Sequence, residues 1–347
     1  MRRSSLLFTA PGQVEVIDEQ VPEPAQGEVL VQTHLSAISP GTERLIFEGY
    51  APTNLSADES LVSLEGDLSF PLRYGYCAIG HVRKLGPGVD EEWMHQPVFA
   101  FHPHSSAFTV RTSELIRLPA SLQPDDAVFL PNLETAVNFL QDGAPLLGER
   151  VVVIGQGIVG LLTTSLVKRT ATQKLLAIEP IESRRTLSEQ VGADAAFDPD
   201  NKAHMQEMEQ ILKLGSKTGG ADLIYELSGN PQALNLAIHY AGFAGRVVIG
   251  SWYGTKNADH LDLGAEFHRQ RLTIKSSQVS TIEPNLRGRW DKSRRIELVL
   301  ELLHSIQPSR WITHRLDIRQ AQDAYEMLAD PDVLQIVFTY GHESAEE

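Results

Sequence analysis

The pattern of apolar and polar residues predicts a first stretch, residues 1 to about 120, that is rich in β-strands. Apolar and polar residues alternate over residues 28–38, and this alternation is typical of a half-buried strand. Pro11-Gly12 separates strand-like segments at 5–9 and 14–18 and predicts a hairpin. Gly86-Pro87-Gly88 predicts a turn between two further strands, at 79–84 and 97–101.

Between residues 121 and 277, short apolar segments alternate with amphipathic ones. The apolar segments are expected to form strands at 151–154, 175–179, 221–227 and 246–250, with a sheet-edge strand at 272–275. The amphipathic segments are expected to form helices at 158–168, 182–191, 204–214 and 231–241. This order predicts an α/β domain with a doubly wound parallel sheet. Residues 278–347 are expected to add helices at 294–303 and 319–328 and a final strand at 335–340. Residues 49–68 have weak periodicity and several acids, and we expect a surface loop or lid there, with disorder as the alternative.

Composition narrows the functional classes. The chain has 347 residues, with 30 Lys and Arg against 45 Asp and Glu, so its net charge is −15. A surface this acidic repels phosphate backbones and anionic lipids, which argues against nucleic-acid and membrane-surface partners. We find no apolar run near the ~20 residues of a transmembrane helix and expect a cytoplasmic protein. Cys77 is the only cysteine, which excludes an intramolecular disulfide and any zinc site with two thiolates.

A glycine-rich motif carries the clearest chemistry. Gly155-Gln156-Gly157-Ile158-Val159-Gly160 follows a predicted β-branched strand and opens a predicted helix. In a dinucleotide-binding motif the first glycine allows a tight turn, the second lets the backbone approach a pyrophosphate, and the third lets helix and strand pack closely. The phosphates would bind at the helix N-terminus, where free N–H groups favour negative charge. The alternative is a plain tight turn.

The expected cofactor is NAD(H), with NADP(H) as the alternative. Glu179 ends the strand that follows the motif, where an acid accepts hydrogen bonds from the ribose hydroxyls and repels a 2′-phosphate. Arg184 and Arg185 argue for NADP(H), unless they belong to a solvated helix face.

Several segments resemble the medium-chain dehydrogenase/reductase superfamily. The resemblance lies in the hairpin start, the glycine-rich loop, and residues 74–80 (YGYCAIG), 226–230 (ELSGN), 245–250 (GRVVIG) and 316–321 (LDIRQA). It implies a GroES-like β-rich catalytic domain (1–120, completed by 278–347), a Rossmann domain (121–277), and an active site in the cleft between them. It also implies a homodimer formed through the sheet edge near residues 272–275.

Two subgroups of the superfamily are similar to this chain. Residues 39–43 (SPGTE) and the Gly75-Tyr76 segment resemble the branch that contains bacteriochlorophyllide a dehydrogenase. Residues 101–104, 251–254 and 289–291 resemble uncharacterised bacterial members described as zinc-binding or threonine-dehydrogenase-like.

The zinc-binding members differ from this chain at their ligand positions. Ser39 stands where they carry a cysteine, and Tyr76 stands within their Gly-His-Glu triplet at the histidine. Their third ligand position falls near Pro131 and Asn132. We therefore expect no zinc, and some other donor must stabilise the developing charge on a substrate oxygen. Tyr76 could supply a hydrogen bond or a proton, or it could simply fill space.

The resemblance and the residue types add further candidates. His102 and His104 could relay protons or hold a metal with Glu43 or Glu134, or they could be ordinary loop histidines. Glu134 lies in a predicted helix that faces the nicotinamide in the superfamily and could be a base or a helix-start glutamate. Other candidates for contact with substrate or cofactor are Thr42, Ser228, Gly229, Trp252, Ser277 and Gln278.

These observations predict a zinc-independent NAD(P)(H)-dependent oxidoreductase that acts on a small molecule. Interconversion of an alcohol and a ketone is the first expectation, with Tyr76 or a histidine as the acid-base group. Reduction of an activated C=C bond is an alternative because conjugation removes the need for zinc. A non-catalytic dinucleotide-binding sensor is the alternative from another class.

Overall fold

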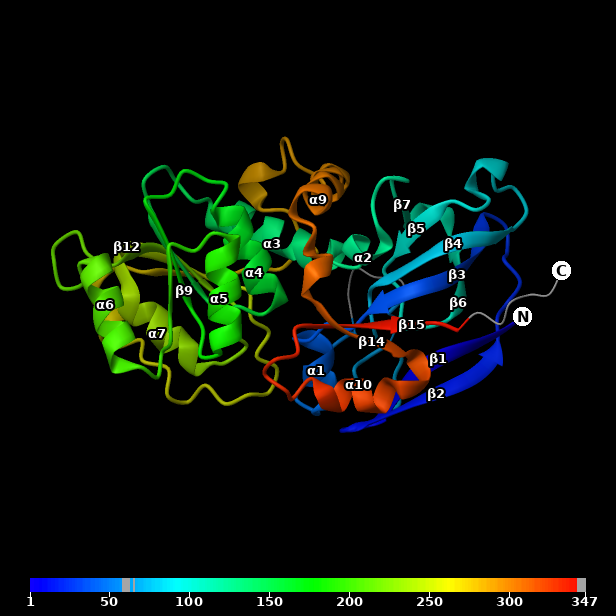
Figure 1. Cartoon of the computed structure of the whole chain (residues 1–347), viewed down its shortest axis with the longest axis horizontal. Helices are drawn as coiled ribbons and strands as arrows, with labels where there is room; N and C mark the ends of the chain where they lie inside the picture. Colours follow the sequence, from blue (N-terminus) through cyan, green and yellow to red (C-terminus); the bar gives the residue numbers. More distant parts are fainter. Residues whose placement is uncertain (58–62, 65, 342–347) are drawn as a thin grey trace. The chain divides into compact units, whose positions relative to one another are not determined.

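The computed structural model describes residues 1–57, 63–64 and 66–341. They divide into two compact units: Met1–Pro131 with Leu300–Glu347, called unit 1, and Asn132–Val299, called unit 2. Unit 1 is rich in strands and unit 2 alternates strands with helices (Figure 1), which confirms the predicted α/β class. The loop expected over 49–68 falls partly on residues 58–62 and 65, which lie outside the described residues.

Unit 1 contains a hairpin and a larger sheet. Strands β1 (Arg2–Ala10) and β2 (Gln13–Gln20) pair antiparallel around Pro11-Gly12, as predicted. The larger sheet has the order β14-β15-β3-β4-β5-β7, with β6 also paired to β3. Its strands are β3 (Glu28–Ala37), β4 (Ala78–Leu85), β5 (Pro97–Ala100), β6 (Ala107–Arg111), β7 (Leu115–Arg117), β14 (Ile312–Asp317) and β15 (Gln335–Thr339). The helices are α1 (Thr42–Phe47), α2 (Pro124–Ala127) and α10 (Ala321–Met327), with short 3-10 turns η1 (Glu91–Trp93), η2 (Thr112–Glu114), η4 (Pro308–Trp311) and η5 (Ile318–Gln320).

Unit 2 is built on a parallel six-stranded sheet of order β10-β9-β8-β11-β12-β13. The strands are β8 (Arg150–Ile154), β9 (Lys174–Ile178), β10 (Ala195–Phe197), β11 (Ala221–Glu226), β12 (Ala241–Ile249) and β13 (Thr273–Ser276). The helices are α4 (Ile158–Val167), α5 (Glu182–Val191), α6 (Lys202–Leu212), α7 (Gln232–Tyr240) and α8 (Glu266–Arg269), with η3 (Pro284–Leu286). Helices α3 (Leu130–Gly143) and α9 (Lys292–Ile306) begin or end in unit 1. Strand β13 lies at the sheet edge, as predicted.

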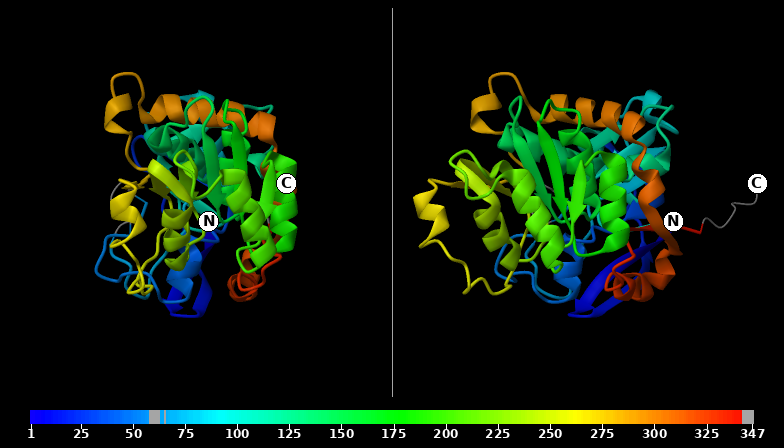
Figure 2. Two further views of the ribbon diagram at one scale, coloured as in Figure 1. Left: turned by 90° about the vertical axis from the view of Figure 1, so that its left-hand side faces the viewer. Right: turned by 60° about the vertical axis from the view of Figure 1, so that its left-hand side comes forward.

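Both faces of this sheet are buried. Val151 and Val153 of β8 pack in one apolar cluster with Phe139 of α3 and Val167 of α4. Their neighbours in β8 point the other way, into a second cluster that includes Leu212 of α6. The unbroken apolar run at 151–154 of β8 is therefore explained by helices on both sides of the sheet (Figure 2).

Helix α1 and strand β14 are among the elements that the sequence did not predict. Helix α1 has only six residues and lacks a side-chain cap, and so short a segment carries too little periodicity to detect. Strand β14 has a mixed pattern of half-buried and exposed residues. Strand β12 begins at Ala241, five residues before the predicted 246, and its pairing with β11 contains a register shift.

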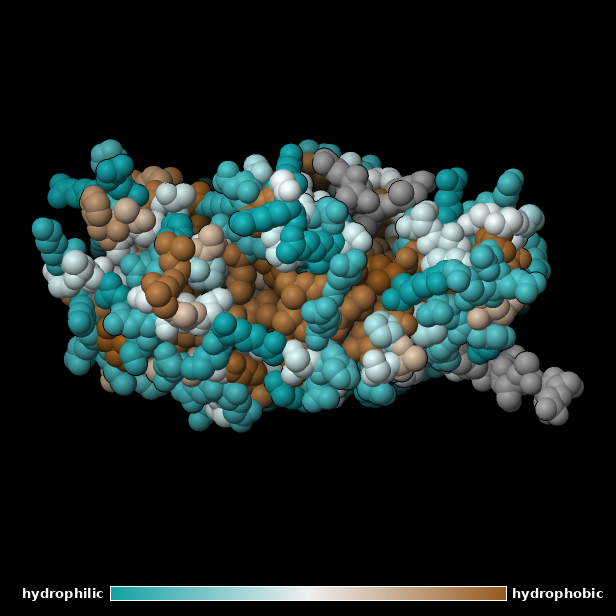
Figure 3. All heavy atoms as spheres, turned by 90° about the horizontal axis from the view of Figure 1, so that it is seen from above, coloured by the Kyte–Doolittle hydropathy of each residue, from teal (hydrophilic) through white to brown (hydrophobic). Residues whose placement is uncertain are grey.

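The face shown in Figure 3 is largely hydrophilic, with apolar residues between the polar ones. Such a mixture is normal for a folded domain, because apolar atoms contribute much of any protein surface. None of the helices in the described part of the chain is long and apolar enough to span a membrane.

The turn between β8 and α4 depends on two very close backbone approaches. Gly155 has φ +88°, and a Cβ there would lie 2.7 Å from the Cα of Ser228. A Cβ on Gly160 would lie 2.0 Å from the carbonyl oxygen of Gly155. A Cβ on Gly157, in contrast, would meet no described atom within 4 Å. The first and third glycines therefore shape the turn, and the second leaves open space beside it.

We expect Gly160→Ala to lower the free energy of unfolding by about 1–3 kcal/mol, because its methyl group would collide with backbone that cannot move aside. Gly157→Ala is the matched control, and its unfolding free energy should change by about 0.5 kcal/mol or less. Urea unfolding followed by circular dichroism measures both. Equal losses for the two variants would contradict the packing that we describe.

Candidate functional site

The backbone N–H groups at the N-terminus of α4 have no acceptor within the helix, and they lie beside the open space at Gly157. Gly157 is the N-cap residue, with φ −69° and ψ −173°, and glycine has no side chain that could cap the helix. Ile158 is buried and Val159 packs against the apolar cluster of β8, so both side chains point away from the turn. The free N–H groups of this first turn can therefore bind an anion such as a pyrophosphate.

Glu179 is joined to the glycine-rich turn. Its carboxylate is buried, and one oxygen, Oε2, accepts a hydrogen bond from the Gln156 N–H at 2.7 Å. Its other oxygen, Oε1, accepts one from the Ile181 N–H at 3.1 Å. The Gln156 side chain is itself held by Thr164, whose hydroxyl donates to Oε1 at 3.0 Å. Since a carboxylate oxygen accepts two hydrogen bonds, Glu179 keeps acceptor capacity for a ribose hydroxyl.

The two arginines after Glu179 are half-buried rather than fully solvated. Arg185 donates through Nη1 to the carbonyl oxygens of Glu179 and Pro180, at 2.8 and 2.6 Å. Arg184 lies one residue earlier in α5. Arg185 therefore stabilises the backbone just after β9.

Further predicted cofactor residues follow β11, β12 and β13 at the same edge of the sheet. Ser228 and Gly229 follow β11, Trp252 follows β12, and Ser277 and Gln278 follow β13. Gly229 donates its N–H to the Ser251 hydroxyl at 2.8 Å, which ties the first two loops together. Trp252 is half-buried and Gln278 is exposed.

Sequence reasoning missed Glu226, which is fully buried at the end of β11. Its Oε1 accepts the Ser228 N–H at 2.8 Å, and its Oε2 accepts the Tyr253 hydroxyl. Burial and the charge of Glu226 raise the pKa of Tyr253 above its ordinary value, so this phenol stays a donor. A charged residue at the end of a strand whose preceding residues, 223–225, are apolar or aromatic was the signal available in the sequence.

Unit 1 brings three predicted hydroxyl residues together. The Tyr76 hydroxyl donates to the Ser39 hydroxyl, and the Thr42 hydroxyl lies 3.5 Å from the same phenol oxygen. Burial raises the pKa of Tyr76 to about 12. The phenol is therefore neutral at physiological pH and remains a hydrogen-bond donor. We call Ser39, Thr42 and Tyr76 the hydroxyl cluster.

Glu43 lies behind the hydroxyl cluster and is fully buried. Its Oε1 accepts the Ser39 N–H at 2.8 Å, and its Oε2 accepts the Tyr325 hydroxyl at 2.5 Å. His104, also fully buried, places Nε2 2.9 Å from Oε2 of Glu43. The chain thus brings Glu43 and His104 together, in a network that fixes the backbone at Ser39.

The other partners of this network come from distant parts of the chain. Nδ1 of His104 lies 2.6 Å from the Ser36 hydroxyl, which lies 2.6 Å from the Tyr340 hydroxyl. Burial and the charge of Glu43 raise the pKa of Tyr325 well above its ordinary value. Local sequence patterns could not identify Ser36, Tyr325 and Tyr340 as members of the network around His104 and Glu43.

His102 and Glu134 have other partners. The His102 ring stacks on Phe108 with 3.8 Å between ring centroids, and Nδ1 lies 2.8 Å from the Pro103 carbonyl oxygen. Burial lowers the pKa of His102 to about 4. Glu134 lies in unit 2, where its Oε1 is 2.8 Å from Arg295 and 2.8 Å from Lys292.

The donor set at the position where the zinc-binding members carry their ligands does not suit zinc. A serine hydroxyl and a phenol with a raised pKa both stay protonated, and in that form each is a poor ligand for a cation that prefers thiolate, imidazole and carboxylate. Over residues 1–57, 63–64 and 66–341, no group of three or more His, Cys, Asp or Glu side chains is arranged to hold a metal ion.

Comparisons with known proteins agree with this architecture. Residues 159–296 match the family model described as zinc-binding dehydrogenase. The L-threonine 3-dehydrogenase of Pyrococcus horikoshii is 25% identical, over 75% of this chain and 79% of its own length. The D-guloside 3-dehydrogenase of Escherichia coli K12 is 24% identical, over 86% and 87%.

Solved structures share the fold. A short chain alcohol dehydrogenase from E. coli CFT073, solved with its cofactor NADH, superimposes with a TM-score of 0.76 at 19% identity and covers 97% of this chain and 99% of its own. This structural likeness shows that the chain has the fold of alcohol dehydrogenases. Its sequence is similar to that of zinc-binding dehydrogenases over part of its length, and the chain is an NAD(P)-dependent oxidoreductase.

Proposed function

We propose that the protein is a zinc-independent dehydrogenase that interconverts an alcohol and a ketone with NAD(H) as the preferred cofactor. The observation that carries the proposal is the hydroxyl cluster, since Ser39 and Tyr76 occupy the positions where the superfamily resemblance places a cysteine and a histidine ligand. The proposed substrate is a small molecule with a secondary alcohol or ketone group.

Unit 2 supplies a binding site that fits a nicotinamide dinucleotide. The open space at Gly157 and the free N–H groups of α4 suit the pyrophosphate, and the carboxylate of Glu179 suits the hydroxyls of the adenosine ribose. The bound cofactor would supply or accept the hydride. The negative charge of Glu179 disfavours a 2′-phosphate, which supports the preference for NAD(H).

The hydroxyl cluster supplies the polar chemistry that zinc would otherwise provide. During ketone reduction, negative charge develops on the substrate oxygen, and a preorganised donor stabilises it. Tyr76 holds its proton up to a pKa of about 12, so it can donate a hydrogen bond and then the proton to that oxygen. Without substrate, Tyr76 donates its single hydroxyl proton to Ser39. With substrate bound, the Ser39 hydroxyl would donate to Tyr76 instead, which frees the phenol proton for the substrate oxygen.

Reduction of an activated C=C bond is the second candidate. The neutral Tyr76 phenol is compatible with C=C reduction too. A conjugated substrate spreads the negative charge that develops during hydride transfer, so a weak hydrogen-bond donor is enough to stabilise it. A panel of ketones and enones, with oxidation of NADH followed by absorbance, distinguishes the two reactions. A non-catalytic dinucleotide sensor would bind NADH and turn over none of them.

We also propose a homodimer. Within the described residues, β13 pairs with β12 alone. The backbone N–H and C=O groups on its outer edge can therefore form hydrogen bonds with a second copy of the chain. A cytoplasmic location remains our expectation from the composition.

The cofactor preference depends on the charge of Glu179. We expect the wild-type chain to bind NADH more tightly than NADPH, and Glu179→Gln to narrow the ratio by about tenfold because the repulsion of the 2′-phosphate is removed. Glu182→Gln, an exposed charge change on the adjacent helix, is the control and should leave the ratio unchanged. Titration of protein fluorescence measures each affinity. A ratio unaffected by Glu179→Gln would show that other residues, Arg184 among them, set the preference.

If the reaction needs no zinc and Tyr76 is the proton donor, metal content and the kcat of a Tyr76 variant can be predicted together. Purified protein should contain well under one zinc per chain, and a chelator should leave turnover intact. Tyr76→Phe should lower kcat by about 10²-fold, because the proton donor is lost while the ring remains. Tyr74→Phe, a buried neighbour, is the control. Stoichiometric zinc whose removal and return abolish and restore activity would overturn the proposal; unchanged kcat in Tyr76→Phe would remove the acid assignment alone.

A further inference from the structure

Arg295 is a fully buried cation that the cofactor motifs do not explain. Its Nε donates to Oε1 of Glu134 at 2.9 Å, and its Nη1 donates to Oδ1 of Asn138 at 2.6 Å. The same guanidinium donates to two backbone carbonyl oxygens, that of Thr281 at 3.1 Å and that of Val279. One side chain of α9 thus joins helix α3 to the segment that follows β13.

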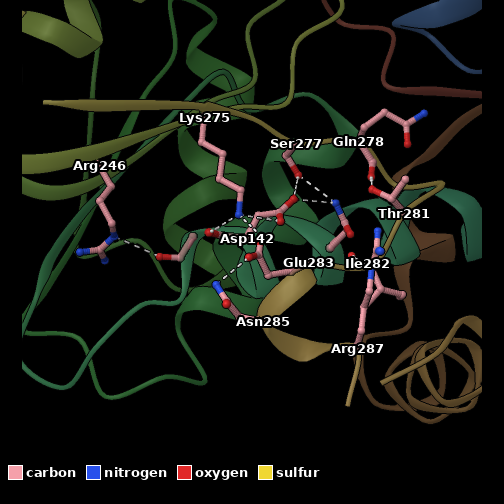
Figure 4. Close-up of polar contacts among 12 residues, drawn as sticks. Asp142, Arg246, Lys275, Ser277, Gln278, Thr281, Ile282, Glu283, Asn285 and Arg287 are labelled. Carbon is pink, nitrogen blue, oxygen red and sulfur yellow. Dashed lines mark hydrogen bonds and ion pairs between the residues drawn. The ribbon is translucent and has the colours of Figure 1, made fainter. Parts of the chain in front are cut away.

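The network continues from Asn138 to the first residue after β13. The Asn138 amide donates through Nδ2 to the Ser277 hydroxyl at 2.8 Å and to Oδ2 of Asp142 at 3.0 Å. The Ser277 hydroxyl also donates to Asp142, and Lys275 lies 2.9 Å from the other oxygen of that carboxylate (Figure 4). Ser277, at the start of the segment, and Lys275, at the end of β13, are therefore tied to α3.

Charges within this network are balanced. Lys275 pairs with Asp142 and Glu283, while Arg295 and Lys292 pair with Glu134. Arg295 and Glu134 are both almost fully buried, and a buried charge without a partner would be strongly destabilising, so each needs the other. The segment 277–283 is thus held at Ser277 and Glu283 (Figure 4). Arg295 also holds it at the carbonyl oxygens of Val279 and Thr281.

The position of this segment relates it to one half of a bound dinucleotide. The last residues of β8, β11, β12 and β13 pair side by side, through Ile154, Glu226, Ile249 and Ser276. Three strand spacings of about 4.8 Å therefore place Ser277 roughly 14 Å from the glycine-rich turn. Glu179, which suits the adenosine ribose, follows β9 on the opposite side of β8. An extended dinucleotide with its pyrophosphate at Gly157 would direct its nicotinamide half toward β13.

We propose that Arg295 is a positioning residue that aligns the Ser277–Gln278 backbone for the nicotinamide half of the cofactor. This inference rests on the proposed function. Arginine suits the task because its planar guanidinium presents five donors in a fixed fork, and here they reach four acceptors on two elements. Lysine would keep the charge beside Glu134 but could not reach all four.

The test compares NADH with ADP, which lacks the nicotinamide half. We expect Arg295→Lys to weaken NADH binding by about tenfold, as one lost positioning hydrogen bond would, while ADP binding changes by about twofold or less. Arg294→Lys, at the exposed neighbour on α9, is the control and should alter neither. Asn138→Leu, which removes the link to Ser277 without adding charge, provides a second variant should Arg295→Lys fail to fold.

The outcomes separate the two proposals. Loss of NADH affinity without loss of ADP affinity, in Arg295→Lys or Asn138→Leu, supports the positioning role. Equal losses for both ligands in the folded variants would show a general structural role and overturn it, as would no loss for either. A wild-type chain that binds neither ligand would contradict the proposed function itself, and the inference would fall with it.

Discussion

The contact between Gly160 and the carbonyl of Gly155 is the constraint on which the dinucleotide site depends. It brings the first turn of α4 against the end of β8 at a distance that no side chain allows. Glu179 then fixes the same turn from the neighbouring strand by accepting the Gln156 N–H. Because both interactions are made within the protein, the anion-binding end of α4 is formed before any ligand arrives. Such preorganisation reduces the cost of binding.

Buried carboxylates are the second feature that fixes the geometry of the structure. Glu43, Glu134 and Glu226 are each almost completely inaccessible, and each accepts hydrogen bonds from a different loop or helix. A buried charge is costly unless it is fully paired, so these residues fix geometry: Glu43 at Ser39, Glu226 at the loops after β11 and β12, and Glu134 at Arg295. The hydroxyl cluster and the sheet edge are each held by one of them.

The sequence predicted the regular elements well and the buried polar networks poorly. Apolar runs such as 151–154 identify a parallel sheet because they must be buried on both faces, and the glycine-rich motif marks its turn through the space each glycine needs. The network around Glu43, however, joins residues 36, 39, 104, 325 and 340. No local period connects positions so far apart, and only the folded chain shows that His104 faces inward while His102 stacks on Phe108.

Hydrogen–deuterium exchange of the wild-type chain with and without NADH tests the central claim most directly. If the dinucleotide lies on the turn between β8 and α4, NADH should slow amide exchange in residues 155–160, where its pyrophosphate would take hydrogen bonds from the free N–H groups. Binding that leaves these amides unprotected, with protection only elsewhere in the chain, would contradict the account.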